Sequence, residues 1–368
     1  MRGNENASRA KAQGSDGPTQ AETAQRPQTT GGAEDAGTSP AGEGTASAGA
    51  GAGPIGRAGL VEAWYRQYRS YLFTIAYRML GTISDAEDVV QDLFVTLSQQ
   101  ASAVSPGGVP IRREKAYLAK MAVNRCLNLL QSAAKRREAY VGPWLPEPLA
   151  DTAHPLPPEA AERVENVSYA FMFLLERLTP LERAVFVLRE TMGYEYAELA
   201  SLLDKSEANC RQLLSRAKRK LEAAGRPEPK PLTERERGLV QRFVAAFRAG
   251  RADELIRLLA DDAVMLSDGG GKVRAAINPI YGPERILRLL HRIASHRLPG
   301  SRFTEFPVGG GIGLAAWDGD LLTAVFCFEW KDGGEDGERT LRRIYSLFNP
   351  DKLARIRPML VPPEGAPA

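Results

Sequence analysis

The chain is poor in the residues that hold metal ions or build disulfide frameworks. Only three cysteines and three histidines occur among its 368 residues. Cys126, Cys210 and Cys327 lie far apart in apolar segments, without the spacing of a zinc site or a redox pair. We expect them to be buried, reduced thiols of a cytoplasmic protein, and we expect no metal and no cofactor.

Long apolar runs are also missing. No uninterrupted run approaches the roughly 18 residues that a membrane span needs, which argues against a membrane partner. Residues 1–56 are mainly small and polar and lack the apolar core of a signal peptide, so 1–58 is predicted to be a disordered leader. The formal net charge is only +3, so the positions of the charges matter more than their sum.

What is present divides into three bodies joined by two linkers. Helical patterns fill residues 59–140 and 162–225, and each predicts an all-α domain. Six prolines make 141–161 an extended linker between them. A second linker at 225–231 leads to a body at 232–360, which begins with helices and continues with mostly antiparallel strands, the order of an α+β domain.

Local signals place several elements more closely. Ser84 is expected to cap a helix that runs to about Ser98, and a long helix is expected from about Arg113 to Ala139. In the C-terminal body we expect helices at 232–249, 253–260 and 283–294, strands at 263–267, 302–308, 311–319 and 320–330, and a last strand at 339–353 that ends in a turn.

The strongest pattern lies at 193–221, which predicts two short helices joined by a tight turn. The first helix has one apolar stripe, formed by Tyr196, Leu199, Ala200 and Leu203. Ser206 is a fitting N-cap for the second, which is apolar on one side and basic on the other. Such a helix suits the major groove of DNA, although a solvated helix end is the alternative for the basic residues alone. The predicted DNA-binding residues are Ser206, Asn209, Arg211, Gln212, Ser215, Arg216, Lys218 and Arg219.

A second basic helix is predicted at 112–139. Asn124, Arg125 and Asn128 recur at three- to four-residue spacing and share a face. Asn is a poor helix former that can hydrogen-bond a base edge, so its place in mid-helix favours a role with flipped bases of a melted strand. A charged, solvated face is the alternative. The predicted residues are Lys120, Asn124, Arg125, Asn128, Arg136 and Arg137.

Acidic residues and one amide follow one side of the helix after Ser84. They suit a basic protein partner, because carboxylates opposite arginines form charge-assisted contacts. The alternative is the ordinary preference for acids at a helix N-terminus. The residues are Asp85, Glu87, Asp88, Gln91 and Asp92.

Together these segments resemble extracytoplasmic-function sigma factors. DAEDVVQDLF (85–94) resembles region 2, and LERLTPLERAVFVLRE (175–190) with the helix-turn-helix resembles region 4. The resemblance implies that the chain binds the β and β′ subunits of core RNA polymerase, the acidic helix gripping β′. It assigns the helix-turn-helix to the upstream promoter element, and the helix at 112–139 to the downstream element and to strand melting.

The C-terminal body resembles the SnoaL-like, nuclear-transport-factor-2-like cone domain of the sigma-J subgroup. Three short motifs carry this part of the resemblance: WLPEP (144–148), DGGGKV (268–273) and NPDKL (349–353). The glycine-rich motif lacks the spacing of a phosphate-binding loop, so we expect an interdomain contact there. The predicted interdomain regulatory residues are Trp144, Leu145, Pro146, Glu147, Pro148, Asp268, Gly269, Gly270, Gly271, Lys272 and Val273.

Two functions from different classes follow from this pattern. The first is an alternative sigma factor, monomeric when free, that its own C-terminal domain regulates in place of a separate anti-sigma protein. The second is a DNA-binding regulator fused to a cyclase-like or isomerase-like enzyme or to a ligand sensor. His291 and His296 fall in or just after a basic helix rather than on strands that would line a cone, so we expect no catalysis.

Overall fold

The computed structural model describes residues 57–103, 113–151, 153, 167–225, 234–332 and 339–363, without the side chains of 57, 58, 100–103 and 133–138. All of these residues belong to a single unit of the chain, Gly53–Ala368. The predicted leader up to residue 56 and most of the second linker lie outside the described ranges. None of the described helices is long and apolar enough to cross a lipid bilayer.

Three long helices open the described chain: α1 (Arg57–Leu80), α2 (Ile83–Ala103) and α3 (Glu114–Glu138). Leu72, Ile75, Leu93, Leu118 and Cys126 are fully buried among them. The apolar sides of the three helices therefore pack against one another. The predicted long helix from about Arg113 to Ala139 is present as α3.

The predicted cap of α2 is wrong. Ser84 lies inside the helix, which begins at Ile83, and the N–H of Ile83 donates to Glu147 Oε2 at 2.7 Å. A carboxylate from the distant linker thus binds one of the N–H groups that every helix leaves without an intrahelical partner.

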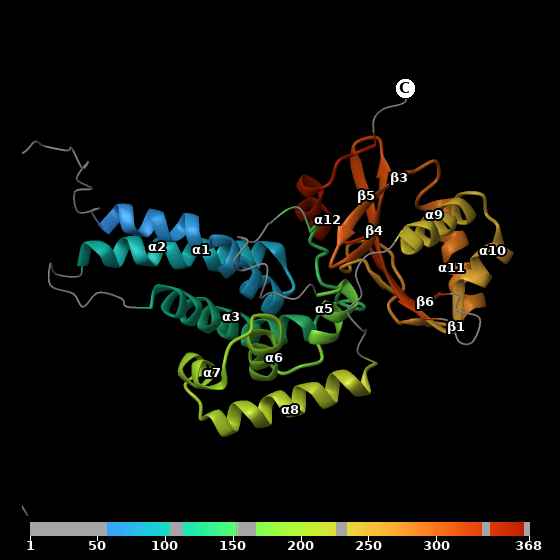
Figure 1. Ribbon diagram of the computed structural model, residues 1–368. Helices are drawn as coiled ribbons and strands as arrows, with labels where there is room; N and C mark the ends of the chain where they lie inside the picture. Colours follow the sequence, from blue (N-terminus) through green and yellow to red (C-terminus); the bar gives the residue numbers. More distant parts are fainter. Residues whose placement is uncertain are drawn as a thin grey trace, which may run out of the picture. The chain divides into compact units, whose positions relative to one another are not determined.

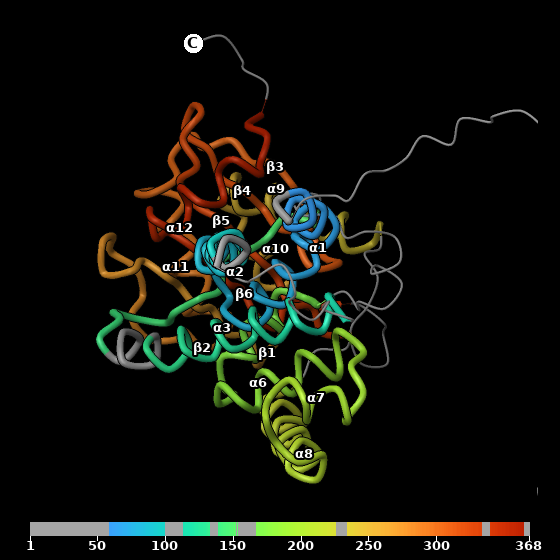
Figure 2. Tube along the Cα trace, turned by 90° about the vertical axis from the view of Figure 1, so that its left-hand side faces the viewer, coloured from blue at the N-terminus to red at the C-terminus, as the bar shows by residue number. Residues whose placement is uncertain are grey.

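The described residues of the second helical body form four α-helices and one π-helical turn. They are α5 (Tyr169–Leu175), α6 (Pro180–Phe186), η1 (Val187–Thr191), α7 (Tyr196–Leu203) and α8 (Glu207–Ala223). Thr179 and Glu182 form a capping box at the start of α6. In both Figure 1 and Figure 2, α6 and α7 lie between α3 and α8.

The predicted helix-turn-helix is present in α7 and α8, with one change in the buried stripe. Leu199, Leu202 and Leu203 are buried on α7, whereas Tyr196 and Ala200 are only half-buried. Between the helices Asp204 adopts φ 51°, a left-handed conformation that Asp tolerates better than most residues.

The described residues of the C-terminal body form a six-stranded sheet and four α-helices. The helices are α9 (Glu234–Arg248), α10 (Ala252–Leu258), α11 (Pro283–His296) and α12 (Pro350–Ile356), with a short η2 (Arg357–Met359). The strands are β1 (Leu259–Asp268), β2 (Ile280–Tyr281), β3 (Arg302–Val308), β4 (Gly311–Asp318), β5 (Leu321–Lys331) and β6 (Thr340–Leu347). The strand order is β2-β1-β6-β5-β4-β3, antiparallel except for the β1–β6 pair.

The predicted α+β order is confirmed, but the end of the last strand is not a simple turn. Asn349 caps α12 by accepting from the N–H of Asp351, and Pro350 occupies the first turn. Proline is favoured there because its missing N–H would have no helical partner. NPDKL therefore begins a helix, and Lys352 lies on its buried side.

Both faces of the sheet are buried, and the side chains of successive residues in each strand point to opposite faces. Helices α9, α10 and α11 cover one face and α12 lies on the other (Figure 1). Phe326 and Ile344 belong to the core shared with α9–α11. Val325 and Tyr345 belong instead to a continuous core shared with both helical bodies and the linker. The outer face of the sheet is thus covered by α12 together with parts of the chain outside the C-terminal body.

Candidate functional sites

Helix α8 has the polar outer side that the sequence predicts. Cys210, Leu214, Ala217 and Leu221 face inward and are buried. The Ser206 hydroxyl caps the helix by accepting from the N–H of Asn209 at 3.2 Å. The exposed predicted DNA-binding residues are Ser206, Asn209, Arg211, Gln212, Ser215, Arg216 and Arg219.

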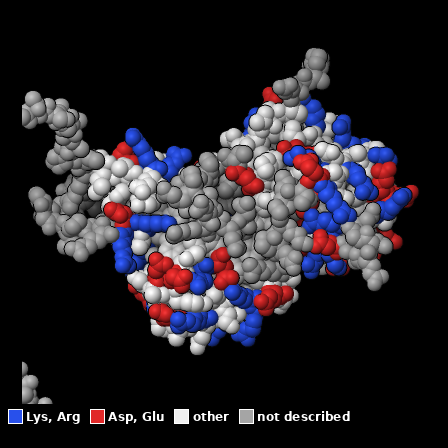
Figure 3. All heavy atoms as spheres, in the orientation of Figure 1, with Lys and Arg blue, Asp and Glu red and all other residues white. Residues whose placement is uncertain are grey.

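Some basic side chains of α8 are held by carboxylates. Arg211 pairs with Glu207 at 2.8 Å and lies over the ring of Tyr196. Lys218 is half-buried and pairs with Glu190 at 3.0 Å. Over α8 the space-filling view shows Lys and Arg with Asp and Glu among them (Figure 3). The surface is therefore mixed, and recognition depends on individual side chains more than on a uniform basic field.

The predicted face of α3 is only partly open. Asn124 and Asn128 are exposed, but Arg125 donates to Thr96 Oγ1 at 2.7 Å. Lys120 pairs with Asp204 Oδ1 at 2.7 Å and donates to the carbonyl of Ser201. Arg136 and Arg137 have side chains outside the described residues. In this structure, Lys120 therefore contacts the helix-turn-helix.

Further contacts join the first helical body to the second. The hydroxyls of Tyr71 and Tyr194 lie 2.7 Å apart, and both side chains are buried. Arg78 donates to the carbonyl of Thr191 at 3.2 Å, and Arg183 donates to the carbonyl of Arg78 at 3.0 Å. Sequence reasoning did not find this interface, because its partners are more than a hundred residues apart and carry no local signal.

The acidic residues of α2 separate into an exposed face and a capped start. Asp88, Gln91 and Asp92 are exposed at a spacing that places them side by side. Asp85 accepts from the Thr82 hydroxyl at 2.6 Å, and Glu87 is half-buried. Three of the five predicted residues thus form an open acidic and amide surface.

Linker and C-terminal body meet at the buried carboxylate of Asp268. Its Oδ1 accepts from the Tyr140 hydroxyl at 2.6 Å and from the N–H of Gly270 at 3.0 Å. Its Oδ2 accepts from the N–H of Leu145 at 3.0 Å and from Lys352 Nζ at 2.8 Å. Asp268 is completely buried, and its donors come from the linker side, its own loop and α12.

Lys352 and the glycines of the loop complete this junction. Lys352 also donates to the carbonyl of Leu145 at 2.5 Å, and its ammonium lies 4.1 Å from the centre of the Trp144 ring. Gly270 has φ 62°, and a Cβ there would lie 2.3 Å from the Asn349 amide nitrogen. The glycine is needed because the loop turns back against α12 with no room for a side chain.

Region 141–151 also binds the first helical body. Tyr77 donates to the carbonyl of Glu147 at 2.6 Å, and the N–H of Glu147 donates to the carbonyl of Gly81 at 2.8 Å. Burial raises the pKa of the Glu147 carboxyl, and the N–H of Ile83 partly offsets this. Residues 145–148 are buried and Trp144 is half-buried, so the motif is packed rather than exposed.

The linker continues onto the sheet edge beyond the motif. Ala150 forms a bridge with Val308, and the Asp151 carboxylate accepts from the N–H groups of Gly309 and Gly310 at 2.7 and 3.1 Å. Tyr140, Lys352, Asn349 and Asp151 were not among the predicted site residues. Of these four, only Asn349 and Lys352 lie in a recognisable motif, NPDKL, that could have indicated a role at the junction.

The space between the sheet and α9–α11 is filled by aromatic side chains. Phe243, Phe247, Phe326 and Phe348 are buried there, with ring centres about 6 Å apart between contacting pairs. His291 and His296 are exposed on α11. Among the described residues, neither histidine therefore faces into this interior.

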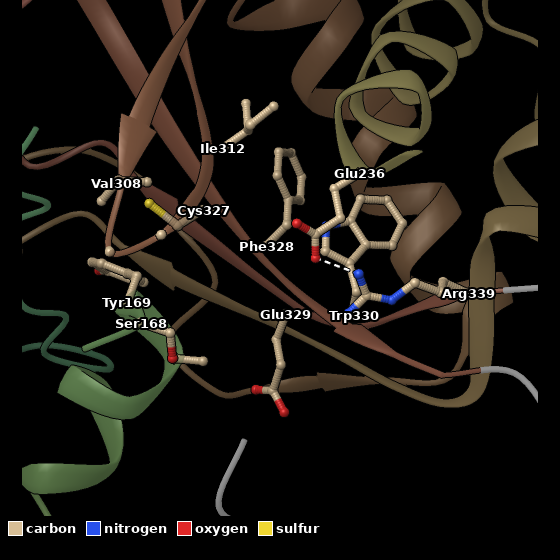
Figure 4. Close-up of a pocket in the computed structure, with 14 residues that line it drawn as sticks. Ser168, Tyr169, Glu236, Val308, Ile312, Cys327, Phe328, Glu329, Trp330 and Arg339 are labelled. Atoms are coloured by element: carbon tan, nitrogen blue, oxygen red, sulfur yellow. Dashed lines mark hydrogen bonds and ion pairs between the residues drawn. The ribbon is translucent and has the colours of Figure 1, made fainter. Parts of the chain in front are cut away.

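A small cavity of about 70 Å³ lies instead where α5 meets the outer face of the sheet. Figure 4 shows Ser168 and Tyr169, from the start of α5, facing strand residues that include Val308 and Cys327. Burial raises the pKa of the Cys327 thiol well above its usual range, which favours an inert, protonated thiol. The cavity has room for only a few water molecules.

Comparison with known proteins agrees with this organisation. The family models of Sigma-70 region 2 and Sigma-70, region 4 match residues 64–136 and 168–221. The ECF RNA polymerase sigma factor SigJ of Mycobacterium tuberculosis is 35% identical over 244 residues, which cover 64% of this chain and 74% of that protein. The chain belongs to the extracytoplasmic-function sigma factors.

Further relatives extend the match to the C-terminal body. The probable sigma factor SigI of M. tuberculosis is 30% identical over 303 residues, covering 81% of this chain and 96% of that protein. The crystal structure of M. tuberculosis SigJ aligns with a TM-score of 0.60 and 28% identity, covering 80% of this chain and 98% of that one. This sigma factor thus combines helical regions 2 and 4 with a nuclear-transport-factor-2-like α+β domain, and it binds core RNA polymerase and directs transcription initiation at particular promoters.

Proposed function

We propose that the C-terminal domain of this alternative sigma factor regulates it in cis by holding the linker between regions 2 and 4. The observation that carries the proposal is the buried carboxylate of Asp268, which binds Tyr140, Leu145 and Lys352 at the same time. A buried charge is tolerated only while its partners are in place. The docked linker and the C-terminal domain therefore stabilise each other.

The same linker segment reaches the polymerase-binding helix. Glu147 binds the N-terminus of α2, and α2 carries the exposed face of Asp88, Gln91 and Asp92. We assign that face to the β′ subunit, with region 4 left to contact β. A change in linker docking thereby acts on the start of the helix that would bind polymerase.

Promoter reading is divided between two helices in this proposal. The exposed residues of α8 read the upstream element in the major groove. The exposed Asn124 and Asn128 of α3 bind the downstream element and the melted strand, and Lys120 joins them once its contact with Asp204 opens.

The proposal needs neither a second copy of the chain nor a separate anti-sigma protein. The restraint lies in the same chain, where its effective concentration is high and independent of protein expression. We therefore propose a monomer whose activity depends on how the linker is docked.

The decisive experiment is in vitro transcription with core polymerase and full-length variants. Asp268→Asn and Trp144→Ala should change promoter output at least about threefold, because a tenfold change needs only about 1.4 kcal/mol. Asp351→Asn is the matched control, since Asp351 is an exposed partner of Lys272 in the same junction. Output equal to wild type in both variants, across several promoters, would leave the C-terminal domain without a regulatory role.

A further inference from the structure

A second contact joins the C-terminal domain to region 4, away from the Asp268 junction. Ala224 is the C-cap of α8, and its carbonyl accepts from Arg343 Nη2 of β6 at 3.2 Å. The last carbonyls of a helix have no partner within it and form the negative end of the helix dipole. A guanidinium is therefore well suited to hold the end of the recognition helix.

Arg343 is itself fixed by a buried carboxylate. Its Nη1 lies 2.9 and 2.7 Å from the two oxygens of Glu329, whose side chain is 4% exposed. The Tyr345 hydroxyl donates to Glu329 Oε2 at 3.1 Å. Because Glu329 on β5 binds both Arg343 and Tyr345 of β6, the guanidinium of Arg343 is oriented toward α8 before region 4 arrives.

The first helix of region 4 rests on the same face of the sheet. The rings of Tyr169 and Phe173 each lie 5.2 Å from the ring of Tyr345. Gly309 lies against the backbone before α5, where a Cβ would come within 2.5 Å of the Val167 carbonyl. Region 4 is thus held at its first helix and at the end of its last one, around the face on which Figure 4 places Glu329.

The two attachments of the C-terminal domain differ in strength. At the linker, three hydrogen bonds cross from Tyr140 and Leu145 to the charged side chains of Asp268 and Lys352, which are at most 7% exposed. At region 4, one hydrogen bond to a backbone carbonyl crosses the junction, together with two aromatic contacts and close packing at Gly225 and Gly309. Undocking the linker would break three hydrogen bonds to buried charged groups, whereas releasing region 4 would break one hydrogen bond, so the linker attachment is the stronger.

Regions 2 and 4 also touch directly, through Lys120 and Asp204 and through Tyr71 and Tyr194. The two regions read separate elements of one stiff duplex, so promoter binding requires them to move apart. Since the C-terminal domain is attached to both, this movement breaks one attachment, and the weaker one breaks first.

We infer that the outer face of the sheet, centred on Arg343 and Glu329, is a releasable docking surface for region 4. The inference rests on the proposed regulation in cis: the docked linker holds the C-terminal domain in place, and region 4 is the domain that this surface holds or releases. Region 2, the linker and the C-terminal domain stay together, while region 4 leaves the surface to form the open, polymerase-binding sigma factor.

The test is the affinity of the full-length protein for core RNA polymerase. Only the open fraction binds, so the apparent dissociation constant rises in proportion as that fraction falls. Arg343→Lys keeps the charge but cannot span Glu329 and Ala224 as a planar fork, so it should bind core polymerase roughly three- to tenfold more tightly. Glu329→Gln should act in the same direction.

Arg357→Lys is the matched control. Arg357 donates to the carbonyl of Asp320 at 3.1 Å. This substitution also changes a hydrogen bond from an arginine to a backbone carbonyl, but both partners lie within the C-terminal domain. Its affinity for polymerase should equal that of wild type. A variant that merely destabilised the fold would bind polymerase more weakly. Tighter binding by Arg343→Lys would therefore indicate release of region 4 and not loss of folded protein.

A distance measurement checks the movement itself. The three native cysteines are buried, so spin labels at Glu222→Cys on α8 and Ser295→Cys on α11 report the spacing of region 4 and the C-terminal domain. The distance distribution should broaden in Arg343→Lys and stay narrow in Arg357→Lys. Unchanged affinity and an unchanged distribution in Arg343→Lys would overturn the inference. If Asp268→Asn still altered transcription, the proposed regulation would stand without it.

Discussion

Asp268→Asn is the sharpest test of the linker junction, because all four neighbours of this carboxylate are donors. Tyr140 and Gly270 donate to one oxygen, and Leu145 and Lys352 donate to the other. An asparagine has one acceptor oxygen, so its NH₂ group must face one of these pairs of donors. Two hydrogen bonds are lost and the ammonium of Lys352 keeps no full counter-charge.

The magnitude follows from the burial of the pair. Asp268 is fully buried and the Lys352 side chain is 7% exposed, so little water screens the change. Removing one partner of a buried ion pair costs about 3–5 kcal/mol, which shifts the docking equilibrium at least 100-fold. The variant should therefore undock the linker well before it unfolds the helical core.

Hydrogen exchange measures this opening directly. The N–H of Leu145 should exchange at least about 100-fold faster in Asp268→Asn, whereas the N–H groups in the middle of α3 keep their protection. Asp351→Asn, at an exposed ion pair with Lys272, should change exchange only a few-fold. Wild-type protection at Leu145 in Asp268→Asn would refute the reasoning, because the junction would then not depend on this charge.

Three further predictions concern the other sites. Arg211→Ala should cost about 1–3 kcal/mol in binding to an upstream-element duplex and relax the sequence preference at one base pair. Arg219→Ala should weaken binding to all sequences alike and reduce the slope of log K against log salt concentration by about one. Duplex titrations at several salt concentrations measure both effects. Reversing the charges of Asp88 and Asp92 should lower the affinity for core polymerase and leave duplex binding by region 4 intact, and equal capture of polymerase would remove this surface from the interface. Burial raises the pKa of Glu147 above its ordinary 4.5, so the folded state holds this proton at a pH where the unfolded chain has released it. The stability of wild type relative to Glu147→Gln should therefore fall as the pH rises from 4.5 through the folded-state pKa, and urea unfolding that gives a constant difference would contradict this sign.

The parts of the fold that the sequence predicts well are those where local pattern and burial agree. β3 spans 302–308 as expected, and α3 follows its periodic apolar positions from Glu114 to Glu138. The prediction of one strand over 339–353 is wrong at its C-terminal end, because the apolar pattern of β6 continues into α12. The Asn349-Pro350 pair is a recognised helix start and could have corrected this.

The sites were less predictable than the elements, because they depend on tertiary contacts. WLPEP and DGGGKV could be paired by resemblance, and the structure brings Leu145 and Asp268 into contact. Tyr140 and Lys352 complete the junction, yet neither has a local pattern that indicates burial with a carboxylate. The contact of Lys120 with Asp204 is equally hidden, since it joins two surface residues 84 positions apart.

In the proposed regulation, the burial of both sheet faces couples the C-terminal domain to the rest of the chain. Cys327, Tyr345 and Leu347 on the outer face are each at most 2% exposed, and α5 and the linker belong to the core that covers this face. Exposing apolar surface costs about 25 cal/mol per Å², so free region 4 and an uncovered sheet are unfavourable in water. Polymerase and promoter DNA must supply that free energy when region 4 leaves. The form with region 4 docked on the sheet is therefore favoured in the free chain. Any change that weakens the contacts of Arg343 with Ala224 or Glu329 shifts the equilibrium toward the open form that initiates transcription.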